Sequence, residues 1–180
     1  MSFSSESSIR LCPTQRDHEI ARLTALALVF VVLEQMIPSP LPGVKPGIAN
    51  IVTLILIKKY DFRTAAWVQL LRVIAGGLLF GYFLTPSFFL SLSGAIGSLF
   101  ILFFTKSLPE RYFSLITSSL LSSFAHIICQ LLVVYFWLIP HEGLRYFLPI
   151  FATSAFIFGT INGIISSFLL KKIEQDSFEK

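Results

Sequence analysis

The sequence is poor in charge, and this scarcity argues first against a soluble domain. Of its 180 residues, 13% are charged and 54% are hydrophobic, whereas soluble domains usually carry about 25% charged residues. Cysteine is also scarce. Cys12 lies near the N-terminus and Cys129 lies within an apolar run, so we expect no disulfide between them. The composition therefore predicts a membrane protein that is not held together by disulfides.

Motifs of common enzyme classes are missing as well. No Gly-rich loop followed by Lys-Ser/Thr occurs, so the chain has no P-loop with which to power transport itself. His-Glu-x-x-His, Gly-x-Ser-x-Gly and Cys-x-x-Cys are also missing. The aspartates Asp17, Asp61 and Asp176 are isolated from one another and form no cluster for magnesium. We therefore expect no enzyme activity, no catalytic residue, no metal and no cofactor.

What the chain does contain is a series of long apolar segments, divided by charged and Pro/Gly-rich clusters. About 20 helical residues cross the roughly 30 Å hydrocarbon layer of a membrane, so the chain is long enough for several crossings. We predict an all-α, polytopic integral membrane bundle of about six transmembrane helices, at residues 19–37, 47–58, 64–84, 86–105, 112–139 and 147–170. This transmembrane domain (19–171) is expected to lie between cytoplasmic tails at 1–18 and 172–180.

The basic residues set the expected orientation. Cytoplasmic loops carry an excess of Lys and Arg, and with a cytoplasmic N-terminus only Lys45 and Arg145 fall in outer loops. The inner segments then hold Arg10, Arg16, Arg22, Lys58, Lys59, Arg63, Lys106, Arg111, Lys171, Lys172 and Lys180. Both termini are therefore expected inside. The net charge of +4 is explained by this distribution, and we expect no nucleic acid partner.

Residues 36–47 depart from the pattern of spanning helices. They read Met-Ile-Pro-Ser-Pro-Leu-Pro-Gly-Val-Lys-Pro-Gly, and the four prolines remove amide donors, which predicts an extended outer loop. The apolar run that follows, 48–57, rises only about 15 Å as a helix, half of a crossing. A loop leading into a short second helix is a candidate lid or wall of a binding cavity. An ordinary outer loop before a longer, tilted second helix is the alternative.

Polar side chains lie within the apolar segments, where an ionisable group costs at least about 2.5 kcal/mol. Gln69 and Arg72 are three residues apart and so share one helix face. His126 and Gln130 are four apart and share another. Asn162 is expected deeper, in helix packing only. The candidate solute-binding residues are Glu34, Lys45, Asn50, Gln69, Arg72, His126 and Gln130.

These residues allow two interpretations. In the first, Glu34 and Arg72 form a structural ion pair that neutralises two buried charges, and His126 is a packing residue. In the second, the polar residues line a pocket for a small solute that enters from outside. Ionisable residues within membrane helices commonly mark such functional sites.

Small residues spaced four apart let helices approach closely. The pairs are Gly77 with Gly81, Gly159 with Gly163, and Ala21 with Ala25. We expect the glycines to serve packing within the bundle. Ala21 and Ala25 begin the first helix and are candidates for docking an external helix.

Several stretches resemble the Gx transporter family, which is also labelled heptaprenyl diphosphate synthase component I. They are Glu34-Gln-Met-Ile-Pro38, Pro42-Gly-Val-Lys-Pro-Gly-Ile-Ala-Asn50-Ile-Val-Thr-Leu54, Leu71-Arg72-Val-Ile-Ala-Gly-Gly77, Ser91-Leu-Ser-Gly94, Ala125-His126 with Gln130, and Tyr146-Phe-Leu-Pro149. The family usually has His-Asn in the fifth helix, whereas Ile127 follows His126 here. The family is similar to the membrane substrate-binding (S) components of energy-coupling-factor vitamin transporters.

The resemblance implies a six-helix, N-in protein of the bacterial inner membrane whose first outer loop closes over a solute. Such proteins work with a separate transmembrane scaffold and two ATPases, and Ala21-Arg-Leu-Thr-Ala25 resembles their scaffold-docking motif. The expected function is therefore solute binding for uptake, powered by other subunits. The alternatives are a membrane anchor of a quinone or flavin redox assembly, and a non-catalytic membrane partner of a prenyl diphosphate synthase.

Overall fold

The computed structural model describes residues 14–36, 47–108, 114–138 and 142–178, which are helical and contain no strand. The α-helices are α1 (Gln15–Met36), α2 (Ala49–Lys59), α3 (Phe62–Leu79), α4 (Pro86–Lys106), α5 (Leu115–Val133) and α6 (Leu148–Phe178). A π-helical turn, η1 (Val134–Leu138), continues α5, and a 3-10 helix, η2 (Glu142–Phe147), leads into α6. The prediction of an all-α fold is confirmed.

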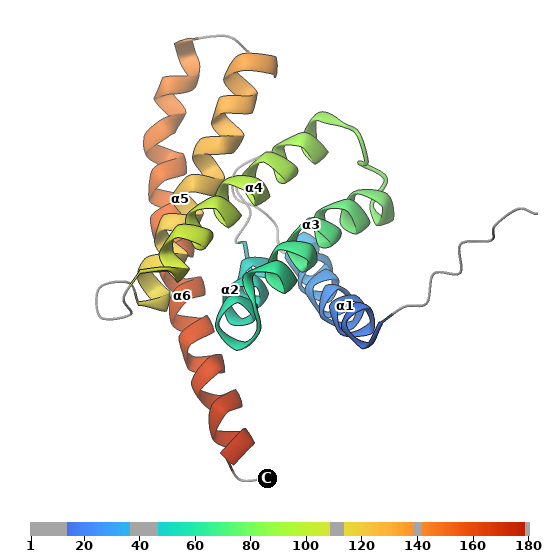
Figure 1. Ribbon diagram of the computed structural model, residues 1–180. Helices are drawn as coiled ribbons and strands as arrows, with labels where there is room; N and C mark the ends of the chain where they lie inside the picture. Colours follow the sequence, from blue (N-terminus) through green and yellow to red (C-terminus); the bar gives the residue numbers. More distant parts are fainter. Residues whose placement is uncertain (1–13, 37–46, 109–113, 139–141, 179–180) are drawn as a thin grey trace, which may run out of the picture.

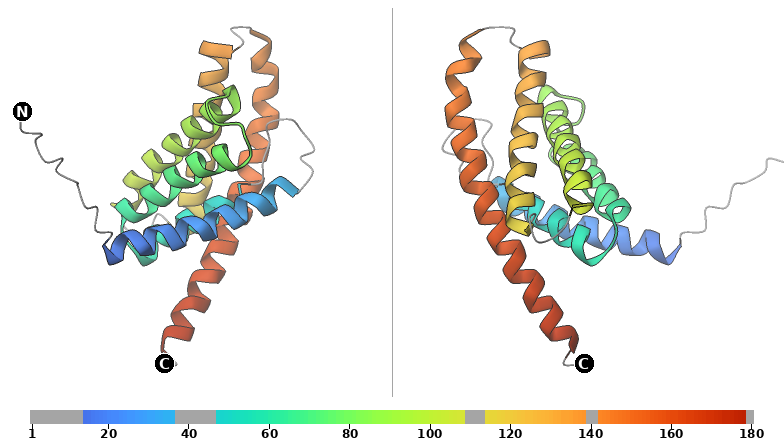
Figure 2. Two further views of the ribbon diagram at one scale, coloured as in Figure 1. Left: turned by 90° about the vertical axis from the view of Figure 1, so that its right-hand side faces the viewer. Right: turned by 60° about the vertical axis from the view of Figure 1, so that its left-hand side comes forward.

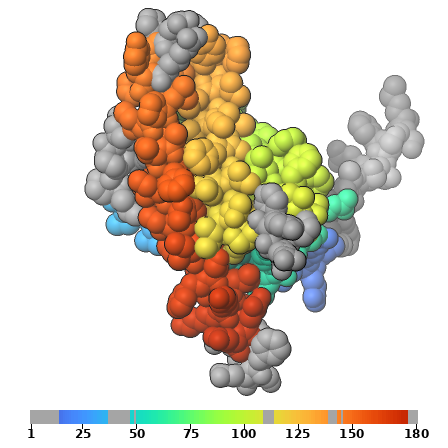
Figure 3. Space-filling view, turned by 90° about the vertical axis from the view of Figure 1, so that its left-hand side faces the viewer, coloured from blue at the N-terminus to red at the C-terminus, as the bar shows by residue number. Residues whose placement is uncertain are grey.

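Two long helices, α5 and α6, run side by side and antiparallel, and the C-terminal part of α6 extends beyond the other helices (Figure 1). Helix α4 packs against α5, and α3 packs against α4. Helix α1 runs across the lower part of the bundle, where it contacts α3 and α2 (Figure 2). Seen from the side of α5 and α6, these two helices cover most of the visible face (Figure 3). Short α2 packs between α3 and α6.

Helix starts follow local capping chemistry. Asp61 precedes α3, and its side chain accepts the Thr64 N–H at 2.9 Å, as an N-cap residue does. Ser114 caps α5 in the same way through the Thr117 N–H. Arg16 on α1 reaches Asp61 at 2.7 Å and so ties the start of α1 to the start of α3. The hydrogen bonds from Thr64, with the nearby Arg16 guanidinium, lower the pKa of the Asp61 carboxyl to about 2.

The short second helix is confirmed. Helix α2 has 11 residues, a rise of about 16 Å, so the alternative of a longer second helix is wrong. Helix α6 is longer than predicted, because it continues past Lys171 and Lys172 to Phe178. That extension, Ile-Glu-Gln-Asp-Ser-Phe, has no Pro or Gly to end a helix.

Three of the described helical stretches are long and apolar enough to cross a membrane: Pro86–Lys106, Leu115–Leu138 and Leu148–Gln175. They leave large apolar side chains on the surface, including Phe100 at 61%, Phe136 at 77% and Phe168 at 69% exposure. Such a surface fits lipid and not water. The chain is a membrane protein, whereas six crossings stay a prediction, because α2 is short and α1 carries charges.

The buried core brings together residues of four helices. Ala27 of α1, Leu54 of α2, Val68 of α3 and Leu102 of α4 form one apolar cluster.

The prediction that the paired glycines serve helix packing holds in part. Gly159 and Gly163 lie against α5, whereas Gly81 lies in the turn after α3 with no neighbour within 4 Å of an added Cβ. The expected close helix contact at Gly81 is therefore wrong, since α3 ends at Leu79.

Candidate functional site

A polar cavity of about 290 Å³ lies among the helices. Residues from α1, α2, α3, α4, α5 and α6 line it, together with the turn after α3. The candidate residues that line it are Glu34, Asn50, Arg72, His126 and Gln130. The other polar lining residues are Gln35, Tyr82, Ser87, Ser91, Ser123, Ser154 and Asn162. The fold thus brings five of the seven predicted residues to one space.

The guanidinium of Arg72 is held in place by two neutral amides. Arg72 is 8% exposed. Its Nε donates to Gln69 Oε1 at 3.0 Å, one helical turn away on α3, and its Nη2 donates to Asn50 Oδ1 on α2 at 2.8 Å. Hydrogen bonds from a charged donor are stronger than neutral ones. The two amides therefore fix the guanidinium at the cavity wall.

Gln69 lies behind this wall and does not line the cavity. Its side chain is fully buried. Its Oε1 accepts from Thr53 Oγ1 at 2.5 Å as well as from Arg72, and its Nε2 donates to Asn50 Oδ1 at 3.5 Å. Gln69 is thus the shared partner of Thr53, Asn50 and Arg72. Its place in the structure is that of a positioning residue for Arg72.

The backbone of Gly47 connects α1 with α6 at the edge of the cavity. Its N–H donates to Glu34 Oε1 of α1. Its carbonyl accepts from Asn162 Nδ2 of α6 at 3.2 Å. Glu34 is 7% exposed and Asn162 is 3% exposed. Both polar groups of one residue are therefore paired with side chains that line the cavity, and α2 begins just after this anchor.

Glu34 and Arg72 form no direct ion pair in the described part of the chain. Among these residues the ion pair within 4.0 Å is that of Arg16 with Asp61. Arg72 bonds to amides and Glu34 to a backbone N–H. The structural ion pair between Glu34 and Arg72, which was the first interpretation of the sequence, is therefore wrong. The reason is that Gln69 and Asn50 lie nearer to the guanidinium than the carboxylate does.

The His126 ring lies against the backbone of α4. A Cβ added to Gly94 would lie 2.6 Å from His126 Nε2, so only glycine leaves room for the ring at this distance. His126 Nδ1 is buried and has no hydrogen-bond partner among the described residues. An unpaired buried nitrogen costs free energy. The Nδ1 of this ring is therefore a buried polar atom without a partner in the described part of the chain.

Other predicted residues have different positions. Ala21 and Ala25 are both exposed on α1, which leaves their face of the helix open. Lys45 and the proposed lid, 37–46, lie outside the described residues, so their roles stay predictions.

Sequence reasoning missed two amide side chains of the lining, Asn162 and Gln35, and several hydroxyls. Asn162 was expected in packing only, but it lines the cavity. A signal exists for it: Ser154, Phe158 and Asn162 are spaced four apart, and all three line the cavity from one face of α6. Serines are common in membrane helices as packing residues, so Ser154 carries no signal alone.

Comparison with known proteins gives one match. A family model described as heptaprenyl diphosphate synthase component I matches residues 23–169, a range that spans the cavity residues of every helix. No curated protein and no solved structure matches the chain.

Proposed function

The chain belongs to the heptaprenyl diphosphate synthase component I family, and we propose that it is an integral membrane subunit that binds a small solute for uptake. The polar cavity carries this proposal. Membrane helices bury ionisable side chains at a cost, and here Glu34, Arg72 and His126 meet at one space of about 290 Å³. Cavities with a few convergent polar groups are the usual sites of small ligands. The chain is proposed to act by binding and not as an enzyme.

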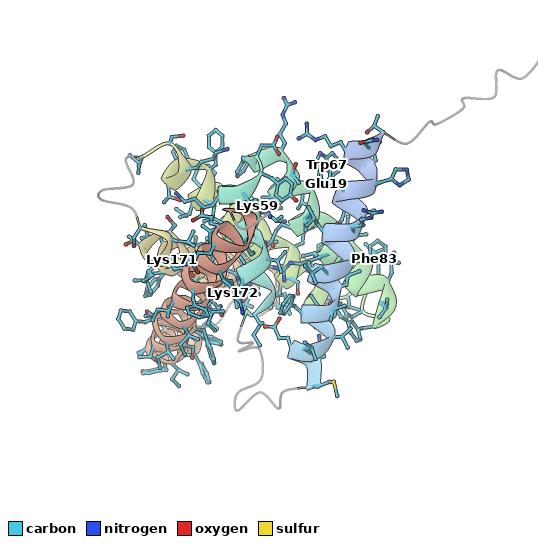
Figure 4. All side chains as sticks on the ribbon, turned by 90° about the horizontal axis from the view of Figure 1, so that it is seen from below. Glu19, Lys59, Trp67, Phe83, Lys171 and Lys172 are labelled. Atoms are coloured by element: carbon cyan, nitrogen blue, oxygen red, sulfur yellow. The ribbon has the colours of Figure 1, made fainter. Side chains whose placement is uncertain are left out.

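The cavity lies away from the basic end of the bundle. On α4 the lining residues Ser87 and Ser91 lie in the first two turns, and Lys106 is in the last. Fifteen residues separate Ser91 from Lys106, which is about 22 Å along the helix. Lys59 of α2 and Lys171 and Lys172 of α6 lie near one another in the view from below (Figure 4).

This distribution supports the proposed topology. Positive residues mark the cytoplasmic side, so the lysine end faces the cytoplasm and the cavity lies in the outer half. Both termini are then inside and the six helices cross or enter the bilayer of a bacterial inner membrane. A solute would reach the cavity from outside.

We propose that separate subunits supply the energy, since the sequence has no P-loop. Ala21 and Ala25 are exposed on α1, and small residues allow the close approach of another helix. This supports a scaffold subunit docking on α1, in the manner of S components of energy-coupling-factor transporters, with two ATPases behind it.

Native mass spectrometry of the full chain, released gently from its own membranes, tests this function. The proposal expects a retained small molecule and co-purifying scaffold and ATPase chains. The retained molecule should be lost in Arg72→Gln and kept in Arg63→Gln, the same substitution at an exposed position of the same helix. A wild-type protein that retains no solute and takes up none from a metabolite extract would contradict the proposal.

The family's description favours a second candidate, a non-catalytic membrane partner of a prenyl diphosphate synthase. The family name is the observation behind it. A soluble synthase chain found in the same purification, with no ATPase, would support this candidate. A sample coloured by flavin would instead point to a redox assembly.

A further inference from the structure

Two opposite charges face the same cavity without touching each other. Glu34 of α1 and Arg72 of α3 both line it, yet the structure places no ion pair between them within 4.0 Å. In the described part of the chain the two charges act on each other at a distance, without a hydrogen bond between them. Taking a charge out of water costs several kcal/mol, which a distant opposite charge offsets less than one in contact, so this separation needs an explanation.

The guanidinium of Arg72 has N–H donors beyond those used by Gln69 and Asn50. Arg72 uses Nε for Gln69 and one N–H of Nη2 for Asn50. A guanidinium has five N–H donors in a planar fork, so these two hydrogen bonds within the described residues leave Nη1 and part of Nη2 for another acceptor. A fork of this kind matches a carboxylate with two parallel hydrogen bonds.

The carboxylate of Glu34 has acceptor positions beyond the one used by Gly47. Glu34 accepts the Gly47 N–H through Oε1, and this is its one hydrogen bond within the described residues. An ionised carboxylate offers about four acceptor positions. The remaining positions suit a donor that carries positive charge, for which a primary ammonium with three N–H groups is the compact choice.

The cavity also limits the size and shape of its occupant. Its volume of about 290 Å³ lies at the lower end of the range of ligand pockets, about 300–1,000 Å³, so it suits a compact molecule. Val31, Leu90 and Phe158 add apolar wall to the polar lining. The site thus offers a cation, an anion, neutral amides and hydroxyls, and a substantial apolar surface.

Building on the proposed function, we propose that the solute is a compact zwitterion of the amino-acid type, with its carboxylate on Arg72 and its ammonium on Glu34. A simple anion would place a second negative charge near Glu34 and give its carboxylate no cationic partner, and a simple cation would do the converse to Arg72. A zwitterion satisfies both charges and adds no net charge to a site within the membrane. The ring of His126 lines the same space.

The test uses the full chain in lipid nanodiscs and begins with the twenty standard amino acids as probes, by thermal stabilisation and then titration calorimetry. Each amino acid that binds is compared with its amide, which lacks the carboxylate, and with its N-acetyl derivative, which lacks the ammonium. We expect each derivative to bind at least about tenfold more weakly, the loss that follows from one charged hydrogen bond. These probes need no variant.

Substitutions of Arg72 and Glu34 test which charged group of the solute each residue binds. Arg72→Gln should weaken binding of the amino acid at least about tenfold, and Arg72→Lys, which keeps the charge but not the fork, covers the case in which Arg72→Gln does not fold. Glu34→Gln should weaken binding of the amino acid more than that of its N-acetyl derivative. The matched controls Arg63→Gln and Glu19→Gln, exposed on the same two helices, should bind as the wild type does.

The possible failures differ from one another. If a retained anion or neutral solute binds in an Arg72-dependent way while no amino acid does, the zwitterion is wrong and the proposed function stands. If an amino acid binds but its amide and N-acetyl derivative bind equally well, the charge pairing is wrong. If no small molecule binds at the cavity at all, the proposed function fails as well.

Discussion

Replacing Gln69 by Leu tests whether the buried amide holds Arg72 in place. Leu is close to Gln in volume, so the substitution removes polar atoms and leaves little empty space. Gln69 is fully buried, and no water is expected to take its place. The Arg72 Nε–H, at 3.0 Å, and the Thr53 hydroxyl, at 2.5 Å, lose their acceptor.

The magnitude follows from these two bonds. A hydrogen bond to a charged group contributes about 1.5–3 kcal/mol, and a buried donor left unpaired costs about 1–3 kcal/mol. The Thr53 hydroxyl can rotate toward a backbone carbonyl of its own helix, which recovers part of its loss. We expect the free energy of unfolding to fall by about 3 kcal/mol, or roughly 150-fold in the folding equilibrium.

The assay is reversible unfolding by SDS in mixed detergent micelles, followed by far-UV circular dichroism. Gln175→Leu, exposed near the end of α6, is the matched control and should change stability by no more than about 0.5 kcal/mol. Combining Gln69→Leu with Arg72→Leu should cost less than the sum of the single losses, because donor and acceptor are then both gone. A Gln69→Leu variant as stable as the control, or strictly additive losses, would refute the proposed positioning of Arg72.

Three further predictions concern packing, pH and topology. Gly163→Ala should destabilise the α5–α6 pair by about 1–3 kcal/mol, since the new Cβ would lie 2.7 Å from Ile116 Cα; unchanged SDS unfolding would contradict this close contact. Asp61 has a pKa of about 2 in the fold and about 3.9 unfolded, so the stability it adds is present above pH 4 and is lost as pH falls toward 2. Asp61→Asn should lack that part of the acid dependence, and identical acid titrations of variant and wild type would refute it. A cysteine at Ser107 should resist an impermeant label in sealed cells while one at Glu142 reacts; labelling at Ser107 would overturn the N-in topology.

Much of the fold could be predicted, because the length of an apolar run and the positions of helix-breaking residues are local features of the sequence. The Pro-rich stretch and the mostly apolar run of ten residues after it correctly predicted that α2 is short. Helix ends were less certain. Helix α1 starts at Gln15 rather than near 19, and α6 continues to Phe178, because polar helix formers extend a helix without an apolar signal.

The site was predictable as a set of residues but not as a set of contacts. Buried polar side chains are costly in a membrane, so Glu34, Arg72 and His126 could be singled out by their positions within apolar segments. Depth counted along straight, parallel helices misplaced Asn162, since α1 and α2 cross the bundle and bring Gly47 to it. The preference of Arg72 for Asn50 over Glu34 depends on packing that no sequence spacing gives.

The most direct test of a solute-binding cavity is an experimental structure of the protein purified from its own membranes with its retained molecules. The account predicts compact density, distinct from water and lipid, that contacts Arg72 and Glu34 and lies beside the His126 ring. A cavity closed by side chains, or filled by a lipid acyl chain, with Glu34 and Arg72 in direct contact, would contradict it.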